Sequence, residues 1–329
     1  MGLLVNGVWQ DEQFRPADPN GAFRRRETSF RNWITPDGSA GPSGEGGFAA
    51  ESRRYHLYVS LACPWAHRTL IVRKLKGLDR HITVDVVHPL MKSHGWMLSA
   101  AHPGATGDTV LGHRFLHQVY SAAAPDVTTR VTVPVLWDRW RGTIVSNESS
   151  EIIRMFNSAF DALTGNRLDL YPAGLRPTID AINASVYEHV NNGVYKAGFA
   201  TSQAAYDDAV ANLFAELDRL EHLLSARRYL AGDRITEADW RLFATLVRFD
   251  PVYVGHFKCN VRRLIDYPAL WAYTRELYQW PGVADTVNMD HIRLHYYASH
   301  ESINPSGIGP AGPDLGFDEP HGRGRAEAS

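Results

Sequence analysis

A single cysteine stands where a predicted strand meets a predicted helix. Cys63 ends the mostly apolar run 56–62, Pro64 follows at once, and apolar residues then recur at helical spacing between 71 and 78. Because proline suits the first helical position, the thiol would lie at the positive end of the helix dipole, among unpaired backbone N–H groups. Both effects favour the thiolate, which is the nucleophilic form of cysteine.

The residues around Cys63 also predict how a disulfide on it would be resolved. A dithiol oxidoreductase would carry a second cysteine at position 66, where Ala66 stands, and the chain's other cysteine, Cys259, is far away in sequence. A mixed disulfide on Cys63 would therefore need an external thiol, for which glutathione is the first candidate. The alternative interpretation is that Cys63 is a small buried apolar residue. For Cys259 we favour a structural over a catalytic role.

Val133 precedes a proline in an unusual place. Pro134 stands inside the apolar β pattern 132–138, where proline removes a ladder hydrogen bond, so the strand is an edge or the peptide bond is cis. Beside a cysteine at a helix start, this is the arrangement of thioredoxin-like domains. There, the residue before the cis-proline offers its backbone N–H and C=O to a peptide ligand, and here that residue would be Val133. An ordinary edge-strand proline is the alternative.

Glu148 and Ser149 follow the next predicted strand, at the start of a helix that we expect Asn147 or Ser149 to cap. A helix N-terminus binds carboxylates through its free N–H groups. The Ser149 hydroxyl could add a donor, and Glu148 could accept from an ammonium group. Glutathione carries both groups on its γ-glutamyl end. The alternative is a helix cap with no ligand.

Composition narrows the class of protein. The 329 residues suit two domains, and 44% hydrophobic with 21% charged residues is typical of a globular protein. A net charge of −2 predicts no nucleic-acid partner, and no apolar run is long enough to predict a membrane span. Two cysteines and no signal-peptide core predict a reducing, cytoplasmic location. The scattered histidines and the lack of a glycine-rich phosphate loop predict neither a metal nor a nucleotide.

Four regions follow from the patterns along the chain. Residues 1–50 are predicted to form an extended arm with a short hairpin around Leu3–Phe14. Residues 51–165 read as β-α-β, then an irregular stretch over 90–130, then a hairpin and a helix, which predicts an α/β domain. Residues 170–301 have helical periodicity throughout. Residues 302–329 are rich in Gly and Pro and are predicted to be an extended or disordered tail that cannot bury a core.

The order of these motifs resembles the glutathione transferases, which implies an N-terminal α/β thioredoxin-like domain followed by an all-α domain. Three longer motifs are similar to a narrower family, the glutathionyl-hydroquinone reductases, or Xi-class, Omega-like transferases. These motifs are Cys63-Pro-Trp-Ala-His-Arg68, Asp250-Pro-Val-Tyr-Val-Gly-His-Phe-Lys-Cys-Asn260 and His295-Tyr-Tyr-Ala-Ser-His300. The resemblance covers about residues 1–310.

The resemblance implies site residues, position by position. Cys63 would be the nucleophile, with Tyr195 and Tyr296 acting on an aromatic substrate and Tyr253 lining its pocket. Glutathione would be held by five residues: Trp96, Arg130, Val133, Glu148 and Ser149. An arginine suits the glycyl carboxylate through bidentate pairing. Tyrosines can pack on an aromatic ring and bond its hydroxyls.

The implied activity is removal of glutathione from glutathionyl-hydroquinones, through a mixed disulfide of Cys63 and glutathione, with glutathione as co-substrate and a homodimer as the assembly. Conjugation of glutathione is disfavoured, because a cysteine near its sulfur would form a disulfide. Two alternatives stay open: an Omega-type or glutaredoxin-like thiol transferase, and a non-catalytic binding protein on the same fold.

Overall fold

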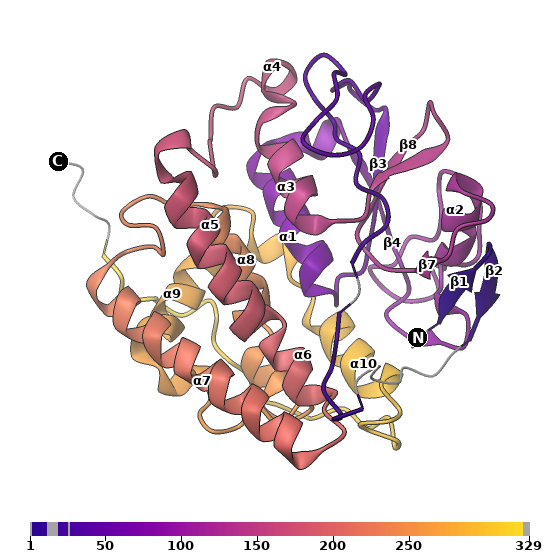
Figure 1. The fold of residues 1–329 in the computed structure, drawn as a ribbon. Helices are drawn as coiled ribbons and strands as arrows, with labels where there is room; N and C mark the ends of the chain where they lie inside the picture. Colours follow the sequence, from indigo (N-terminus) through magenta and orange to yellow (C-terminus); the bar gives the residue numbers. More distant parts are fainter. Residues whose placement is uncertain (1, 12–18, 26, 325–329) are drawn as a thin grey trace. The chain divides into compact units, whose positions relative to one another are not determined.

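The computed structural model describes residues 2–11, 19–25 and 27–324, and within them the chain forms two compact units. The first comprises Met1–Arg15, Arg25–Asp169 and Thr286–Gly309, and the second comprises Pro16–Arg24, Leu170–Asp285 and Pro310–Ser329. Strands and helices alternate in the first half and helices fill most of the second (Figure 1), which confirms the predicted fold class. No helix in the described part is long and apolar enough to cross a membrane.

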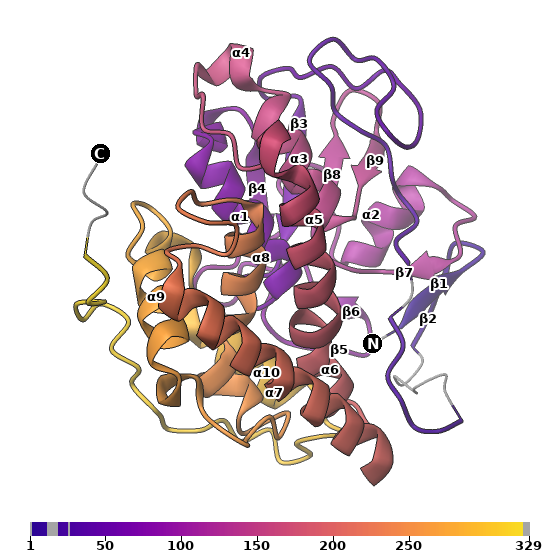
Figure 2. The same ribbon diagram turned by 60° about the vertical axis from the view of Figure 1, so that its left-hand side comes forward.

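A four-stranded sheet forms the centre of the first unit, in the order β4-β3-β8-β9. The strands are β3 (Tyr55–Val59), β4 (Thr83–Val86), β8 (Val135–Asp138) and β9 (Thr143–Ser146). Strand β3 pairs parallel with β4 and antiparallel with β8, as the predicted β-α-β unit and hairpin require. Helices α1 (Pro64–Leu75) and α3 (Ser149–Ser158) lie together on one side of the sheet, and α2 (Leu116–Ala123) lies on the other (Figures 1 and 2).

The helix ends differ from the prediction in two places. Helix α1 stops at Leu75 rather than near residue 78, because Gly77 takes a left-handed conformation with φ +68°. The cap of α3 is neither Asn147 nor Ser149 but Glu148, whose carboxylate accepts the backbone N–H of Ser150. Glu148 therefore stabilises the helix start at which we expect a ligand.

The N-terminal arm begins with a hairpin of β1 (Leu3–Val5) and β2 (Val8–Gln10), turning at Asn6-Gly7, where both residues have positive φ. Strand β1 also pairs with β7 (Thr129–Arg130), giving a second sheet in the order β2-β1-β7. The predicted hairpin is confirmed over residues 3–10, and Phe14 lies outside the described residues. A third, two-stranded sheet joins β5 (Met91–Lys92) to β6 (Gly95–Trp96).

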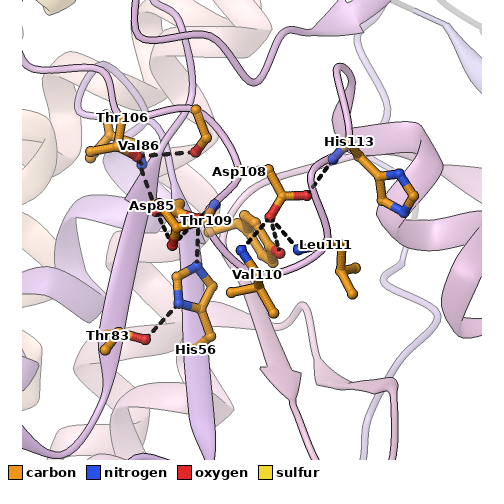
Figure 3. A network of polar contacts seen from close by, with 12 residues as sticks. His56, Thr83, Asp85, Val86, Thr106, Asp108, Thr109, Val110, Leu111 and His113 are labelled. Atoms are coloured by element: carbon orange, nitrogen blue, oxygen red, sulfur yellow. Dashed lines mark hydrogen bonds and ion pairs between the residues drawn. The ribbon is translucent and has the colours of Figure 1, made fainter.

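A buried aspartate fastens the irregular segment 97–115 to the central sheet (Figure 3). Asp85 on β4 accepts the backbone N–H of Thr109 at 2.6 Å and the hydroxyl groups of Thr106 and Thr109. Its carboxylate also lies 3.1 Å from Nε2 of the buried His56 on β3. Through these bonds the loop shares one network with two neighbouring strands.

A second aspartate closes the same segment on itself. Asp108 accepts backbone N–H groups from Val110, Leu111 and His113 (Figure 3). The Tyr58 hydroxyl of β3 also donates to Asp108, at 2.9 Å. The loop that begins directly after Trp96 is thus held by two carboxylates as well as by the antiparallel bridge between Met97 and Phe115 at its ends.

The second unit is built on helices with apolar buried faces: α5 (Arg176–Ser185), α6 (Gly193–Gly198), α7 (Gln203–Ala226), α8 (Glu237–Leu246) and α9 (Pro268–Tyr278). Thr236 and Asp239 form the expected capping box at the start of α8. The tail adds more than predicted: Phe317 is buried between Trp271 and Tyr278, with ring centroids 5.4 and 5.1 Å away.

The first unit also contains the 3-10 helix η1 (Leu78–Arg80), the short α4 (Asp161–Thr164) and α10 (Met289–Ser299). Our prediction groups residues up to 301 with the helical half, whereas α10 packs with the first unit. The physical reason lies in two histidines of α10. His291 Nε2 is 2.7 Å from the carbonyl oxygen of Pro103, and His295 Nδ1 is 2.9 Å from that of Pro89.

Candidate active site

Cys63 occupies the position that its sequence context predicts. It is the N-cap of α1, with Pro64 as the first helical residue, and its side chain is half-buried. Its Sγ lies 3.6 Å from the carbonyl oxygen of Val133, and the Val133–Pro134 peptide bond is cis. The structure therefore brings the thiol, the start of helix α1 and the backbone of Val133 together. A position at a helix start favours the thiolate form of a cysteine, whereas the Val133 carbonyl oxygen can accept only from the protonated thiol.

A second helix N-terminus presents Glu148 and Ser149. Ser149 is the first residue of α3 and is buried, while Glu148 is half-buried. One carboxylate oxygen of Glu148 accepts the backbone N–H and the hydroxyl of Ser150, at 3.0 and 2.7 Å. The other oxygen accepts the Thr28 hydroxyl at 3.2 Å. These bonds hold a carboxylate in one orientation beside a set of helix N–H groups, which suits a ligand carrying both an ammonium and a carboxylate.

The charge of Glu148 is set by competing effects. Burial alone would raise its pKa, but the hydrogen bonds from Ser150, the positive charge of Arg68 and the Thr28 hydroxyl together hold the pKa below its ordinary value. The carboxylate is therefore ionised in neutral and mildly acidic solution. It can accept a charge-assisted hydrogen bond there.

Sequence reasoning missed Arg68 and Thr28 as supports of this site. The sequence contained a signal for Arg68, because this residue falls three positions before Ile71 on the predicted apolar stripe. In the structure its side chain is buried, with 1% exposed. A charged residue on such a stripe needs a partner in the folded protein. Thr28 carried no signal, since it lies in the arm, 120 residues before Glu148.

Trp96 and Arg130 both lie on strands of two residues each, β6 and β7. Trp96 is buried and stacks on His295 of α10, with ring centroids 4.8 Å apart. Arg130 is half-buried and stands opposite Leu3 in the pairing of β1 with β7. The two residues are thus presented from short strands rather than from the loop that we expected.

The three tyrosines divide between the units. Tyr296 on α10 is buried in the first unit, with its ring edge-on to His295 at 5.4 Å. Tyr195 on α6 and Tyr253 lie in the second unit, 6.3 Å apart, and Phe257 contacts both rings. The structure therefore brings Tyr195 and Tyr253 into one aromatic cluster.

Cys259 belongs to the second unit and is fully buried, and burial raises the pKa of its thiol well above the usual value. A thiol of this kind stays protonated and is a poor nucleophile. The half-buried Cys63 is therefore the better candidate for thiolate chemistry.

The chain matches two family models over its two halves. Residues 62–159 match the glutathione S-transferase N-terminal domain, and residues 203–276 match the C-terminal domain. Glutathionyl-hydroquinone reductase YqjG of Escherichia coli is 59% identical over 98% of both chains. Glutathionyl-hydroquinone reductase PcpF of Sphingobium chlorophenolicum is 50% identical over 95% of this chain and 96% of its own.

Solved structures of the same family are similar to this chain in fold as well as in sequence. The glutathione-bound structure of Escherichia coli YqjG has a TM-score of 0.91 at 58% identity, covering 98% of this chain and 99% of that one. A Xi class transferase from Natrialba magadii has a TM-score of 0.90 at 50% identity, covering 98% and 96%.

Proposed function

The chain belongs to the Xi class of glutathione transferases, together with the glutathionyl-hydroquinone reductases, and on this premise we propose that it removes glutathione from glutathionyl-hydroquinones. The products are the free hydroquinone and glutathione disulfide. One observation carries the proposal: Cys63 caps α1 with its sulfur beside Val133, and Ala66 stands where a resolving cysteine would be.

The reaction proceeds in two steps, each of which is an attack by a thiolate on sulfur. The Cys63 thiolate attacks the sulfur of the bound glutathionyl group, the carbon–sulfur bond breaks, and the aryl carbon takes up a proton, helped by ketonisation of the hydroquinone. Cys63 is then disulfide-bonded to glutathione. A second glutathione attacks the glutathionyl sulfur as its thiolate, releases glutathione disulfide and restores Cys63. The thioether carbon is reduced and two glutathione sulfurs are oxidised.

The remaining site residues act on the two ends of the substrate. The peptide end lies against the backbone of Val133, and Glu148 and Ser149 bind the γ-glutamyl ammonium and carboxylate. Arg130 pairs with the glycyl carboxylate, and Trp96 covers the peptide. The fixed orientation of Glu148 and its ionised state support this arrangement.

Tyrosines serve the aromatic end. Tyr195 and Tyr296 steer the hydroquinone hydroxyls, and Tyr253 lines the pocket. Their phenol groups can bond an oxygen while their rings pack on the substrate. The aromatic cluster that holds Tyr195 and Tyr253 supports a flat apolar ligand.

We further propose the organisation that goes with this activity. Residues 51–165, joined by α10, form the glutathione-binding domain, and residues 170–285 form the substrate and dimerisation domain. The enzyme works as a homodimer in the cytoplasm. The two reduced cysteines, one of them buried, are consistent with a reducing compartment.

The decisive experiment is turnover of glutathionyl-menadiol with excess glutathione, comparing wild type with Cys63→Ala and with Cys259→Ala as the matched control. We expect free menadiol and glutathione disulfide from wild type and from Cys259→Ala, and no turnover from Cys63→Ala. Activity on a glutathione mixed disulfide alone would instead indicate a general thiol transferase. Inactivity of the wild type in both assays would indicate a binding protein.

A further inference from the structure

The N-terminal hairpin of β1 and β2 contacts both short strands that carry Trp96 and Arg130. Strands β6 and β7 have two residues each, which is too short to fix a side chain's orientation without further support. The hairpin supplies that support to both strands: the ring of Trp9 contacts Gly95 of β6, and the backbone of β1 pairs with β7. Figure 1 shows β1 beside β7.

Trp9 packs directly on the turn before Trp96. Its indole N–H donates to the Ser93 carbonyl at 3.0 Å, and its ring lies over Gly95. A Cβ added at Gly95 would come within 2.9 Å of the Trp9 ring, and Gly95 has φ +70°, so this close approach needs glycine. The indole therefore fixes the residue immediately before Trp96.

A stack of rings extends this contact to the residues after Trp96. Trp9 stacks on His117 at 4.8 Å, His117 lies parallel to Phe115 at 5.5 Å, and Phe115 stacks on His94 at 4.8 Å. Phe115 is bridged to Met97 in antiparallel register. Trp9 thus contacts Gly95, which precedes Trp96, and is linked through His117 and Phe115 to Met97, which follows Trp96.

The other edge of the hairpin holds Arg130. Leu3 of β1 stands opposite Arg130, and Leu3 itself is buried. At the turn, the Gly7 N–H donates to the Val127 carbonyl at 2.9 Å and the Asn6 N–H to the Thr128 hydroxyl at 3.0 Å. Residues 127–130 therefore bond to the hairpin at every position, first to its turn and then to β1.

We propose that Trp9 is a positioning residue for glutathione binding. It packs the N-terminal hairpin against β6 and so keeps the side chains of Trp96 and Arg130 in the positions that bind the ligand. The inference rests on the proposed function through the roles given to Trp96 and Arg130. Trp9 itself makes no contact with substrate in this scheme. Misplacement of a binding group by about 1 Å is enough to cost up to a hundredfold in efficiency.

The test compares Trp9→Ala, Trp9→Phe and Val8→Ala, with Trp96→Ala and Arg130→Ala as references. Val8 is the matched control, because it is the preceding residue of the same strand and is 60% exposed. The readouts are the Kd for S-methylglutathione, which cannot react with Cys63 by thiol exchange, the KM for glutathione against kcat, and the alkylation rate of Cys63.

We expect Trp9→Ala to raise the Kd and KM about tenfold, within the range that misplacement produces, with kcat and Cys63 alkylation unchanged. Trp9→Phe keeps a ring on His117 but loses the N–H donor to Ser93 and the ring atoms over Gly95, so it should recover only part of the affinity. Val8→Ala should match wild type. A merely structural Trp9 would lower the melting temperature and leave Kd unchanged, which would overturn the inference.

The same measurements separate this inference from the proposed function. Weaker S-methylglutathione binding in Trp9→Ala, in a protein that turns over no glutathionyl-hydroquinone, would uphold the positioning role and refute the reductase activity. Unchanged binding in Trp96→Ala and Arg130→Ala would refute the inference, because there would be nothing for Trp9 to position.

Discussion

At the scale of single residues, hydrogen bonds decide the charge of Glu148. Burial opposes ionisation, but donors from Ser150 and Thr28 and the nearby Arg68 hold the pKa below the ordinary value of about 4.3 for glutamate. Because the folded-state pKa is depressed, the ionised form stabilises the fold above the ordinary range. That contribution is lost as the pH falls through the lower, folded-state value.

We therefore expect Ser150→Ala to shift the acid limit of ligand binding to higher pH. The substitution removes the hydroxyl donor and keeps the backbone N–H, so the pKa of Glu148 should rise while the helix cap remains. The measurement is the Kd for S-methylglutathione between about pH 7 and pH 4, which spans the ordinary carboxyl range. Ser158→Ala, at the exposed end of the same helix, is the control. An unshifted profile in Ser150→Ala would contradict the role given to its hydroxyl.

The sequence predicts residues of this kind when their signal is local. Cys63, Val133 and Glu148 each stand beside a proline or a helix start that marks them. Thr28 and Trp9 support the same site through partners far away in the chain, and no spacing rule reports such a partner. The α3 cap differs from the prediction because Glu148, which is not among the preferred capping residues, accepts the Ser150 N–H that a shorter side chain is expected to accept.

At the scale of elements, the predicted strands and hairpins are present because their alternation and turn residues are local. The segment 97–115 was predicted only as irregular. Its order comes from Asp85 and Asp108, whose partners are backbone N–H groups and hydroxyls without a sequence period (Figure 3). Carboxylates that accept backbone N–H groups add here to the antiparallel bridge between Met97 and Phe115, and that arrangement is visible only in the folded chain.

We expect Asp108→Asn to lower the free energy of unfolding by about 1–3 kcal/mol, since one acceptor for the loop N–H groups is lost. Burial raises the pKa of Asp108, but the loop N–H groups and Tyr58 outweigh it and lower the pKa. The difference from wild type should therefore be constant at neutral pH and shrink below about pH 4. Urea unfolding across this range is the measurement. The control is Asp126→Asn at an exposed position. Equal urea midpoints for the two variants would refute the stabilising role given to Asp108.

At the scale of the whole molecule, each unit is assembled from discontinuous segments. Residues Thr286–Gly309 return to the first unit, and Pro310–Ser329 to the second, within the described ranges. The prediction placed residues up to 301 in the helical half without assigning α10 to a unit of its own, because membership depends on contacts such as His295 with Trp96. Composition likewise marked the tail as unable to bury a core, whereas one residue, Phe317, is buried between two rings of α9.

This connectivity predicts that the two units unfold together. Each unit is made of segments that are joined through the other unit, so unfolding of one unit removes the constraint on the ends of those segments. Phe317→Ala in the second unit should cost about 3 kcal/mol. S-methylglutathione, bound at the first unit, should add about 2.7 kcal/mol at a hundredfold excess over its Kd. We expect calorimetry to show one transition that responds to both changes, with the exposed Ile308→Ala as the control for the tail. Two transitions, one moved only by the ligand and the other only by Phe317→Ala, would show instead that each unit folds independently despite the repeated crossings of the chain.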